Sequence, residues 1–552
     1  MSSVDPGSGR PFRQVICIGL DGATFDVIDP MIAAGRLPNL AKLMENGTRS
    51  RLASTVPPLT APAWVSFMTG LNPGRHGVFH FRAMEERTLS TDLVGSWMYR
   101  GRTIFDRASK DDLETIAFRV PMTYPAWPIN GVMVSGFPTP DPRTNFSHPP
   151  EIGSNMDSLV KLAPVASMMA GIEDQIDNFE YYIERSTKAI LDLMEARRPD
   201  FFCYVNSITD WIAHKFWRFS DPAAPGYEPH PMPDGTLLEH FYDRVDESVG
   251  RILEAADDDA FVLVLSDHGT GPRTNRRFNT NAWLQEQGLL VRSSGQRGRK
   301  AAAGVVAWLK DVAPKKHWLW RKVPDRVRRS TGALRAYGGA IRWESTRAYR
   351  VEIDHHVEGI NVNLSGREPH GSVAEEDYET VRDEILAAAK DLRDPATGKK
   401  VVDRACRREN LYEGPFAGRA PDVVLILNPS VEAGHSAANH TFSEVADSRL
   451  ERSSATHRPD GIFIASGPGV RSGFDLGDAS LVDAPATLLW SLGLELPAEM
   501  DGRVLEEAFE PGLLEAHPIR RTAESSTTTS DGAYSDAEEE QVAAHLEDLG
   551  YL

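Results

Sequence analysis

The stretch Val15-Ile-Cys-Ile-Gly-Leu-Asp21-Gly22 decides how this chain folds. Its first six residues form an uninterrupted apolar run, which is typical of a strand buried on both faces of a parallel sheet. An aspartate and a glycine then end the run. Ligands of open α/β sheets bind beyond the carboxyl ends of the strands, so Asp21 is expected at a functional edge. The alternative is a simple turn, because strand-Asp-Gly is also a common way to end a strand.

Further apolar runs predict a large sheet. The run from Phe261 to Leu265 continues into Ser266-Asp267-His268-Gly269 and repeats the opening pattern, and a helical pattern covers Ile172 to Arg197. Strands that alternate with helices indicate an α/β fold whose mostly parallel central sheet is covered by helices on both faces. The expected strands are residues 15–20, 116–120, 132–135, 201–205, 261–265, 348–351, 360–364, 423–427 and 462–465.

Composition narrows the class of protein. The 552 residues are 41% hydrophobic and carry a net charge of −19, which argues against general nucleic-acid binding. Two of the three cysteines, Cys17 and Cys203, lie in apolar runs and are expected to be buried free thiols, which suits a reducing compartment. The sequence has no secretory signal pattern and no run of eighteen apolar residues, so we expect a cytoplasmic protein.

The expected organisation is an α/β core interrupted by one insertion. Residues 292–350 carry sixteen Lys and Arg against three Asp and Glu, which predicts either a solvated helical insertion or a cap that binds an anionic substrate or an anionic membrane surface. A terminal helix at residues 538–552 can dock on the body or on a partner subunit of a homo-oligomer. The predicted segments are a flexible N-terminus (1–13), the first part of the core (14–290), the basic cap (291–346), the second part of the core (347–510) and a flexible acidic tail that ends in a short helix (511–552).

Four separated segments carry metal-binding residue types. They are Asp21, Asp210-Trp-Ile-Ala-His214, Asp267-His268, and His457, which has His435 and His440 as alternatives. On a helix, positions i and i+4 put Asp210 and His214 on one face. Each segment alone also fits a strand cap or a surface pair. Together, three carboxylates and three imidazoles suit Zn²⁺, or Mn²⁺ or Fe²⁺, and are enough for two divalent ions.

The segment Thr55-Val-Pro-Pro-Leu-Thr60-Ala-Pro-Ala-Trp-Val-Ser-Phe-Met-Thr-Gly70 supplies a candidate nucleophile. Pro62 suits the first turn of a helix that ends near Gly70, which places Thr60 at the helix N-terminus. Two metal ions can clamp the oxygens of a displacement at phosphorus, and a metal lowers the pKa of a bound hydroxyl. Thr60 is therefore a candidate nucleophile, with a plain helix N-cap as the alternative.

Taken together, these motifs resemble the type I phosphodiesterase/nucleotide pyrophosphatase branch of the alkaline phosphatase superfamily, over residues 14–510. The resemblance implies an alkaline-phosphatase-like sheet with an inserted cap. It rests on Gly-Leu-Asp21-Gly, Pro58-Leu-Thr60-Ala-Pro, Thr69-Gly-Leu-Asn-Pro-Gly-Arg-His-Gly77, Asp210-x-x-x-His214, Ser266-Asp267-His268-Gly269 and His457 followed by Gly461-Ile-Phe-Ile-Ala-Ser-Gly-Pro-Gly469.

The same resemblance implies the site chemistry. It implies a phosphoric-ester hydrolase acting on small phosphate esters or diesters, with diesters favoured. Thr60 would form a phospho-threonine intermediate that water later hydrolyses. One ion would be held by Asp21, Thr60, Asp267 and His268, and the other by Asp210, His214 and His457.

The sequence departs from the family pattern beside the nucleophile. Nucleotide pyrophosphatases typically place an asparagine some way after it, and no asparagine lies between Thr60 and Leu71. Asn206 or a backbone N–H is a candidate substitute. Arg75 is a candidate for a second anionic group of the substrate, together with His76 and Arg82. Tyr124 is a candidate for stacking, among the aromatic residues that flank the motifs: Trp64, Phe79, Phe81, Trp211 and Trp217.

Other activities are open on the same site. A phosphomonoesterase would use the basic cap against the extra charge, and a phosphotransferase would pass the phosphoryl group to an alcohol. A formylglycine sulfatase is disfavoured because Thr60-Ala-Pro-Ala-Trp64 lacks the Cys or Ser and the arginine of that motif. A non-catalytic binding protein would have degenerate ligands, whereas all seven ligand positions are filled here.

Overall fold

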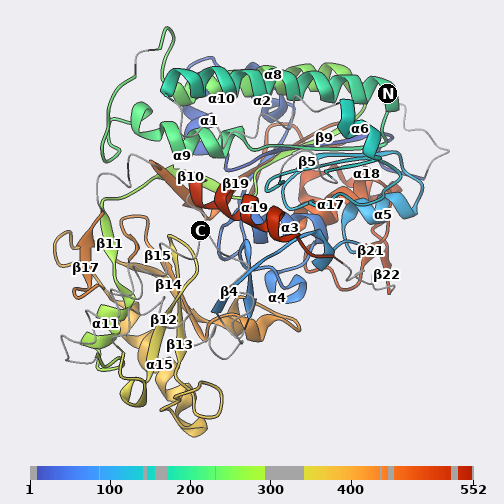
Figure 1. The fold of residues 1–552 in the computed structure, drawn as a ribbon. Helices are drawn as coiled ribbons and strands as arrows, with labels where there is room; N and C mark the ends of the chain where they lie inside the picture. Colours follow the sequence, from blue (N-terminus) through green and yellow to red (C-terminus); the bar gives the residue numbers. More distant parts are fainter. Residues whose placement is uncertain are drawn as a thin grey trace. The chain divides into compact units, whose positions relative to one another are not determined.

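The computed structural model describes residues 9–85, 88–140, 146–155, 171–230, 232–292, 341–434, 438–445, 450, 453–523 and 532–549. The chain forms two compact units, each with its own hydrophobic core (Figure 1). The first unit comprises Met1–Ala83, Thr91–Pro272 and Glu451–Leu552, and the second comprises Met84–Ser90 and Arg273–Leu450. In the described part of the chain, no helix is long and apolar enough to cross a membrane.

The first unit is built on a large mixed sheet. Among the described residues it has nine strands in the order β20-β2-β19-β9-β1-β8-β5-β6-β7. The strands from β9 to β6 are parallel, whereas β19 runs antiparallel to β9 and β2, and β7 runs antiparallel to β6. The predicted fold class, a mostly parallel sheet covered by helices, is confirmed. The bounds are β1 (Val15–Leu20), β2 (Gly47–Ala53), β5 (Thr115–Val120), β6 (Gly131–Ser135), β7 (Ser147–His148), β8 (Phe201–Asn206), β9 (Phe261–Leu265), β19 (Asp460–Ser466) and β20 (Phe474–Ser480).

Strand β1 lies between β8 and β9, and its register sets the position of the site. Leu20 pairs with Asn206 on one side, and Gly19 pairs with Leu265 on the other. All three strands are apolar and fully buried, as expected for central parallel strands. Because they end at the same level, the residues that follow them leave the sheet at one edge.

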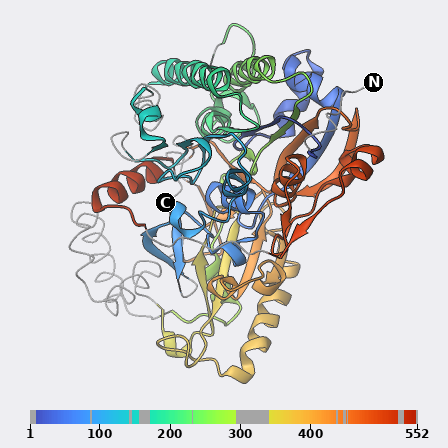
Figure 2. The same ribbon diagram turned by 90° about the vertical axis from the view of Figure 1, so that its right-hand side faces the viewer.

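Helices cover both faces of this sheet (Figures 1 and 2). One layer contains α1 (Phe25–Ala33), α2 (Pro38–Glu45), α8 (Ile172–Arg197), α9 (Ile208–Ser220) and α10 (Leu237–Ala255), and the other contains α3 (Thr60–Thr69), α5 (Ile104–Lys110) and α17 (Asp483–Ser491). In α10, Phe241, Val245 and Val249 recur every four residues and are buried, so a single apolar stripe faces the core. A capping box between Thr236 and Glu239 starts that helix.

A short antiparallel ladder lies beside the main sheet. Strand β10 (Gly269–Pro272) continues from the end of β9 and pairs with β18 (Ala455–Arg458), so that Thr270 faces His457. This pairing brings His457 next to residues that precede it by almost two hundred positions.

The second unit has a core of its own. Its four-stranded antiparallel sheet has the order β12 (Ala348–Glu352), β13 (Val357–Val362), β15 (Val423–Leu427) and β14 (Val402–Arg407), with α15 (Tyr378–Lys390) packed on it. A three-stranded sheet adds β16 (Glu432–Ala433), β11 (Arg276–Phe278) and β17 (Phe442–Glu444), and α11 (Thr280–Glu286) follows β11. The hairpin of β3 (Arg82–Glu85) and β4 (Thr88–Leu93) contributes Met84–Ser90.

This division differs from the boundaries expected from sequence. The strands near residues 348, 360 and 423 were expected to belong to the α/β core, but they pair antiparallel with one another inside the second unit. The unit is therefore larger than the predicted cap at 291–346. Most of that cap, residues 293–340, lies outside the described residues.

Both ends of the described chain contribute to the core of the first unit. Phe12, within the N-terminal segment expected to be flexible, stacks on Phe261 with ring centroids 4.9 Å apart. In the C-terminal tail, α18 (Pro511–Ala516), β22 (Arg521–Thr522, paired with β21, Leu496–Pro497) and α19 (Asp536–Leu549) are formed, and Val542 and Leu546 are buried. Cys17, Cys203 and Cys406 are buried and free, as expected for the first two.

Candidate active site

Five elements of the first unit bring the predicted ligands together. Asp21 follows β1, Asp267 and His268 follow β9, and all three are buried. Asp210 and His214 lie on α9, which begins just after β8, and His457 lies in β18. Thr60 is the first residue of α3. All seven residues are at most 6% exposed, so the cluster is screened from bulk water.

Asp21, Asp267 and His268 form one group of potential metal ligands, with one donor atom of each within 4.8 Å of the others. Nε2 of His268 lies 3.3 Å from Oδ2 of Asp267 and 3.7 Å from Oδ1 of Asp21. The same nitrogen lies 3.4 Å from Oγ1 of Thr60. The threonine hydroxyl is therefore part of this group.

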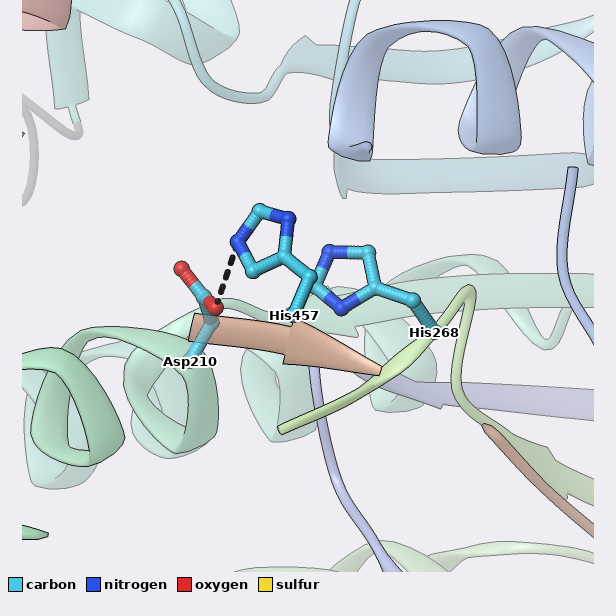
Figure 3. Close-up of side chains that lie close together, drawn as sticks. All are labelled: Asp210, His268 and His457. Atoms are coloured by element: carbon cyan, nitrogen blue, oxygen red, sulfur yellow. Dashed lines mark ion pairs between the residues drawn. The ribbon is translucent and has the colours of Figure 1, made fainter. Parts of the chain in front are cut away.

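Asp210, His268 and His457 form a second group of the same kind (Figure 3). Oδ1 of Asp210 lies 3.5 Å from Nε2 of His457 and 3.3 Å from Nε2 of His214. The rings of His268 and His457 stack with centroids 3.9 Å apart. His268 thus belongs to both groups, which makes the seven residues one continuous site.

Main-chain carbonyls orient the three imidazoles. Nδ1 of His457 lies 2.9 Å from the carbonyl oxygen of Pro58, and Nδ1 of His268 lies 3.1 Å from that of Gly269. Nδ1 of His214 lies 3.1 Å from the carbonyl oxygen of Ala455. A carbonyl oxygen can only accept, so each Nδ1 carries the proton and each Nε2 presents its lone pair to the cluster. This is the tautomer that binds a metal through Nε2.

The helix that carries Thr60 is not capped by it. The residue at the N-cap of α3 is Leu59, and Thr60 is the first helical residue, so the plain N-cap alternative is wrong. Every residue of α3 is buried, and Gly70, at φ 68°, ends the helix. The hydroxyl of Thr60 is thus held on a rigid element at the helix N-terminus.

The buried carboxyl groups of the cluster lie too close together for all of them to be ionised without a compensating positive charge. Burial, together with the charges of Asp267 and Asp210, raises the pKa of Asp21 well above its usual range, and burial raises the pKa of Asp267 to about 7. Burial lowers the pKa of His268, which keeps this ring neutral. For Asp210, burial alone would raise the pKa, and His214 and His457 hold it well below the usual value only in their protonated, donating form. Carboxylates this close together are favoured when a cation shares them.

Two buried oxygens also indicate a missing charge. Oδ1 of Asp21 and Oδ2 of Asp267 have no hydrogen-bond partner among the described residues. A buried carboxylate oxygen without a partner is costly, and a divalent cation would compensate it. The donor set of three carboxylates and three neutral imidazoles therefore fits divalent metal ions.

The candidate substrate-binding residues are engaged elsewhere. Oδ1 of Asn206 accepts a hydrogen bond from the N–H of Ile208 at 2.9 Å, and Arg75 pairs with Asp501 at 2.8 Å. Tyr124 donates to the Glu538 carboxylate and stacks on Tyr534. None of the three belongs to the two ligand groups. Of the alternatives to His457, His440 is exposed in the second unit, and His435 lies outside the described residues.

Several residues that form hydrogen bonds around the ligands were not predicted from the sequence. Ser207 donates to Oδ2 of Asp21 at 3.3 Å, and Thr209 donates to the main-chain oxygen of Asp21 at 2.6 Å. Thr270 donates to the main-chain oxygen of Gly22 at 2.9 Å. Their common signal is a hydroxyl residue within five positions of the end of β8 or β9, the two strands that are followed by ligands. The carbonyl of Pro58 has no such signal, because every residue has a carbonyl.

A site of this composition at the carboxyl edge of an α/β sheet is characteristic of enzymes that use metal ions to hydrolyse phosphoric esters. Residues 15–460 match the model of the family described as type I phosphodiesterase / nucleotide pyrophosphatase, and the chain belongs to this family. It is accordingly a metal-dependent hydrolase of phosphoric ester bonds, and the resemblance predicted from the motifs is confirmed.

Solved structures with similar folds include two ectonucleotide pyrophosphatase / phosphodiesterase 5 proteins. The murine protein is 12% identical, with a TM-score of 0.44 over 87% of this chain and 95% of its own. The human protein is also 12% identical, with a TM-score of 0.45 over 90% of this chain and 99% of its own. Phosphonoacetate hydrolase from Sinorhizobium meliloti 1021, in complex with phosphonoformate, is 17% identical, with a TM-score of 0.48 over 87% and 95%.

Proposed function

We propose that this enzyme hydrolyses small-molecule phosphoric diesters, with Thr60 as nucleophile and two divalent cations, Zn²⁺ being the best match to the donor set. The observation that supports this most directly is the 3.4 Å separation between Oγ1 of Thr60 and Nε2 of His268. His268 belongs to both groups of potential ligands, so the hydroxyl lies where two ions would share a site.

The ligands divide between the two ions as the family pattern implies. One ion would be held by Asp21, Thr60, Asp267 and His268. The other would be held by Asp210, His214 and His457. Bound ions would supply the positive charge that lowers the pKa of the Thr60 hydroxyl and neutralises the phosphoryl oxygens. Zn²⁺ prefers four ligands in a tetrahedral arrangement and binds both oxygen and nitrogen donors, so it matches these two ligand sets.

Thr60 acts in two steps. First, the Thr60 hydroxyl gives up its proton to solvent and its Oγ1 forms a bond to phosphorus while the bond from phosphorus to the leaving alkoxide breaks. The leaving alkoxide takes up a proton from solvent, so the step consumes no net proton. Water then attacks the phospho-threonine, the Oγ1–phosphorus bond breaks, and the threonine hydroxyl returns as a phosphate monoester leaves. The N-terminal amides of α3, a ten-residue helix, favour a phosphoryl oxygen at this position.

The proposed preference for diesters is based on the family to which the chain belongs, and it can be tested by comparing hydrolysis rates on a diester and a monoester. We would measure initial rates on bis-p-nitrophenyl phosphate and p-nitrophenyl phosphate, with Zn²⁺ or Mn²⁺, for the wild type and Thr60→Ala. We expect a large diester preference, and a loss of at least about 1,000-fold in Thr60→Ala, because the nucleophile is removed. Thr69→Ala is the matched control: Thr69 is buried on the same helix, and its hydroxyl donates to the carbonyl of Val65 at 2.7 Å.

Mass spectrometry completes the experiment. A trapped phosphoryl group on the peptide that contains Thr60 supports the covalent step, and its absence under burst conditions counts against it. A monoester preference would assign the site to a phosphomonoesterase. Phosphoryl transfer to an added alcohol at the expense of hydrolysis would assign it to a phosphotransferase.

A further inference from the structure

Two serines precede β18, the strand that carries His457, and both contact His214. Ser453 is half-buried and Ser454 is buried. Helix α9, which carries His214, packs against β18 (Figure 3). The two serines therefore connect the elements that supply two ligands of the same proposed ion.

Ser453 contacts the imidazole of His214 through Nδ1, the nitrogen that does not face the ligand cluster. Its Oγ lies 3.1 Å from Nδ1 of His214 and donates to the carbonyl oxygen of Ala455 at 3.2 Å. The same carbonyl oxygen lies 3.1 Å from Nδ1. Because the hydroxyl proton is directed at Ala455, Ser453 accepts from the protonated Nδ1, and Nε2 presents its lone pair to the cluster. The hydroxyl therefore supports the tautomer that a metal ligand needs.

Ser454 contacts the main chain of the same histidine. Its N–H donates to the carbonyl oxygen of His214 at 2.6 Å, and its hydroxyl donates to that oxygen at 3.1 Å. The hydroxyl also accepts from the N–H of Arg218 at 3.2 Å. An α-helix pairs the carbonyl of residue i with the N–H of residue i+4, so the Ser454 hydroxyl bridges one such pair of α9. It thereby fixes the helical turn that follows His214.

We infer that Ser453 and Ser454 are positioning residues that hold His214 in place relative to His457, so that both imidazoles reach one ion. Ser453 orients the ring, and Ser454 fixes the helical turn that carries it. The inference rests on the proposed function, because it assumes that His214 holds a metal ion. Hydrogen-bond partners of a ligating histidine orient its ring, and their loss typically costs 10–100-fold in metal affinity or activity.

The test compares three serine-to-alanine variants. Ser453→Ala and Ser454→Ala each remove one set of these contacts. Ser220→Ala is the matched control: Ser220 ends α9, and its hydroxyl donates to the carbonyl of Phe216 at 3.1 Å and accepts from the N–H of Leu238 at 3.2 Å. Zn²⁺ affinity of the apoproteins would be measured by competition with a chromophoric chelator. We expect one of the two Zn²⁺ sites to weaken about 10-fold in Ser453→Ala and Ser454→Ala, and neither site to change in Ser220→Ala.

Three further readouts distinguish positioning from a general structural role. Ser453→Thr keeps the hydroxyl and should keep the wild-type Zn²⁺ affinity. The rate on bis-p-nitrophenyl phosphate should fall in Ser453→Ala and Ser454→Ala at limiting Zn²⁺ and return toward the wild-type rate at saturating Zn²⁺, because the ligands themselves are intact. Thermal unfolding midpoints of the apoproteins should fall by similar amounts in Ser454→Ala and Ser220→Ala, which remove the same kinds of hydrogen bond, although only Ser454→Ala weakens Zn²⁺ binding.

The outcomes separate this inference from the proposed function. If the wild-type apoprotein binds no divalent ion, the two-metal proposal fails, and the inference fails with it. If the wild type binds two Zn²⁺ ions and both Ser453→Ala and Ser454→Ala bind them equally well, only the positioning role is overturned. Equal weakening in Ser220→Ala would overturn it as well, because the effect would then come from general loosening of α9. If the buried Ser454→Ala does not fold, Ser453→Ala at the half-buried position decides the inference.

Discussion

Nε2 of His214 and Nε2 of His457 lie 3.1 Å apart, although both rings direct Nδ1 at a main-chain carbonyl. With both protons on Nδ1, two nitrogen lone pairs face each other beside the Asp210 carboxylate. A cation between them would turn this repulsion into coordination. The orientation of the rings is therefore a direct structural argument for metal binding, independent of any sequence motif.

Removal of one ligand should separate metal binding from folding. We expect Asp267→Asn to retain about one of the two equivalents of tightly bound metal, because the second ion has its own ligands. We expect it to lose at least about 100-fold in kcat/KM, since even supporting residues of metal sites cost 10–100-fold. Metal content by mass spectrometry and rates would be measured on the same preparation. Asp246→Asn is the matched control: Asp246 is buried in the first unit and accepts from the N–H of Leu40 at 2.8 Å. Full metal content and activity in Asp267→Asn would refute the ligand assignment.

The contact between Gly19 and Trp64 predicts a steric effect. We expect Gly19→Ala to lower the free energy of unfolding by about 1–3 kcal/mol, because the added methyl meets the indole ring and Val205 in a packed core. Urea unfolding measures this. Gly512→Ala, also in the first unit, is the control, because a Cβ there meets nothing within 4 Å. Equal free energies of unfolding for Gly19→Ala and Gly512→Ala would contradict the prediction, because they would show that α3 can shift to accommodate the added methyl group.

Buried neutral histidine predicts acid sensitivity. Nδ1 of His76 accepts the N–H of Val78 at 3.1 Å, and burial, followed by the charge of Arg102, lowers the pKa of His76 to about 3. The depressed pKa means that stability is present above pH 6.5 and is lost as the pH falls toward 3. With a pKa near 6.5 in the unfolded state, protonation of His76 should lower the free energy of unfolding by about 2 kcal/mol between pH 7 and pH 5.

The measurement is the change in unfolding free energy between these two pH values. The loss should be about 2 kcal/mol smaller in His76→Asn than in the wild type, since asparagine accepts the same N–H without titrating. The exposed His370→Asn should keep the wild-type loss. Identical losses in wild type and His76→Asn would contradict the prediction.

The C-terminal helix should detach when its aromatic anchor is removed. Tyr534 is buried between Tyr124 and Trp97, with ring centroids 5.7 and 5.1 Å away. Truncation of such a ring costs about 3 kcal/mol, so Tyr534→Ala should speed amide exchange in α19 by about 100-fold. Hydrogen–deuterium exchange of residues 536–549 checks this, with the exposed Tyr181→Ala as control. Unchanged protection of α19 would show that Val542 and Leu546 hold the helix without Tyr534.

Sequence reasoning reached the elements whose signals are local. Apolar runs at 15–20 and 261–265 became β1 and β9, the helical pattern at 172–197 became α8 with the same bounds, and the seven expected ligand positions lie together. The boundary of the second unit was missed, because a buried antiparallel strand such as β15 is as apolar as a parallel one. The pairing of Arg75 with Asp501 was missed because no local pattern encodes a contact between distant segments.

The ladder between β10 and β18 has a consequence for how this enzyme can diversify. Pro272 pairs with Ala455. The segment Arg273–Leu450 of the second unit begins directly after Pro272 and ends shortly before Ala455. In topological terms, that segment is the loop of a single β-hairpin. A hairpin loop can be lengthened, shortened or exchanged while its two strands stay in register. Evolution can thus rebuild this segment while His457 keeps its place opposite Thr270, so that reaction chemistry and accessory architecture are free to change separately.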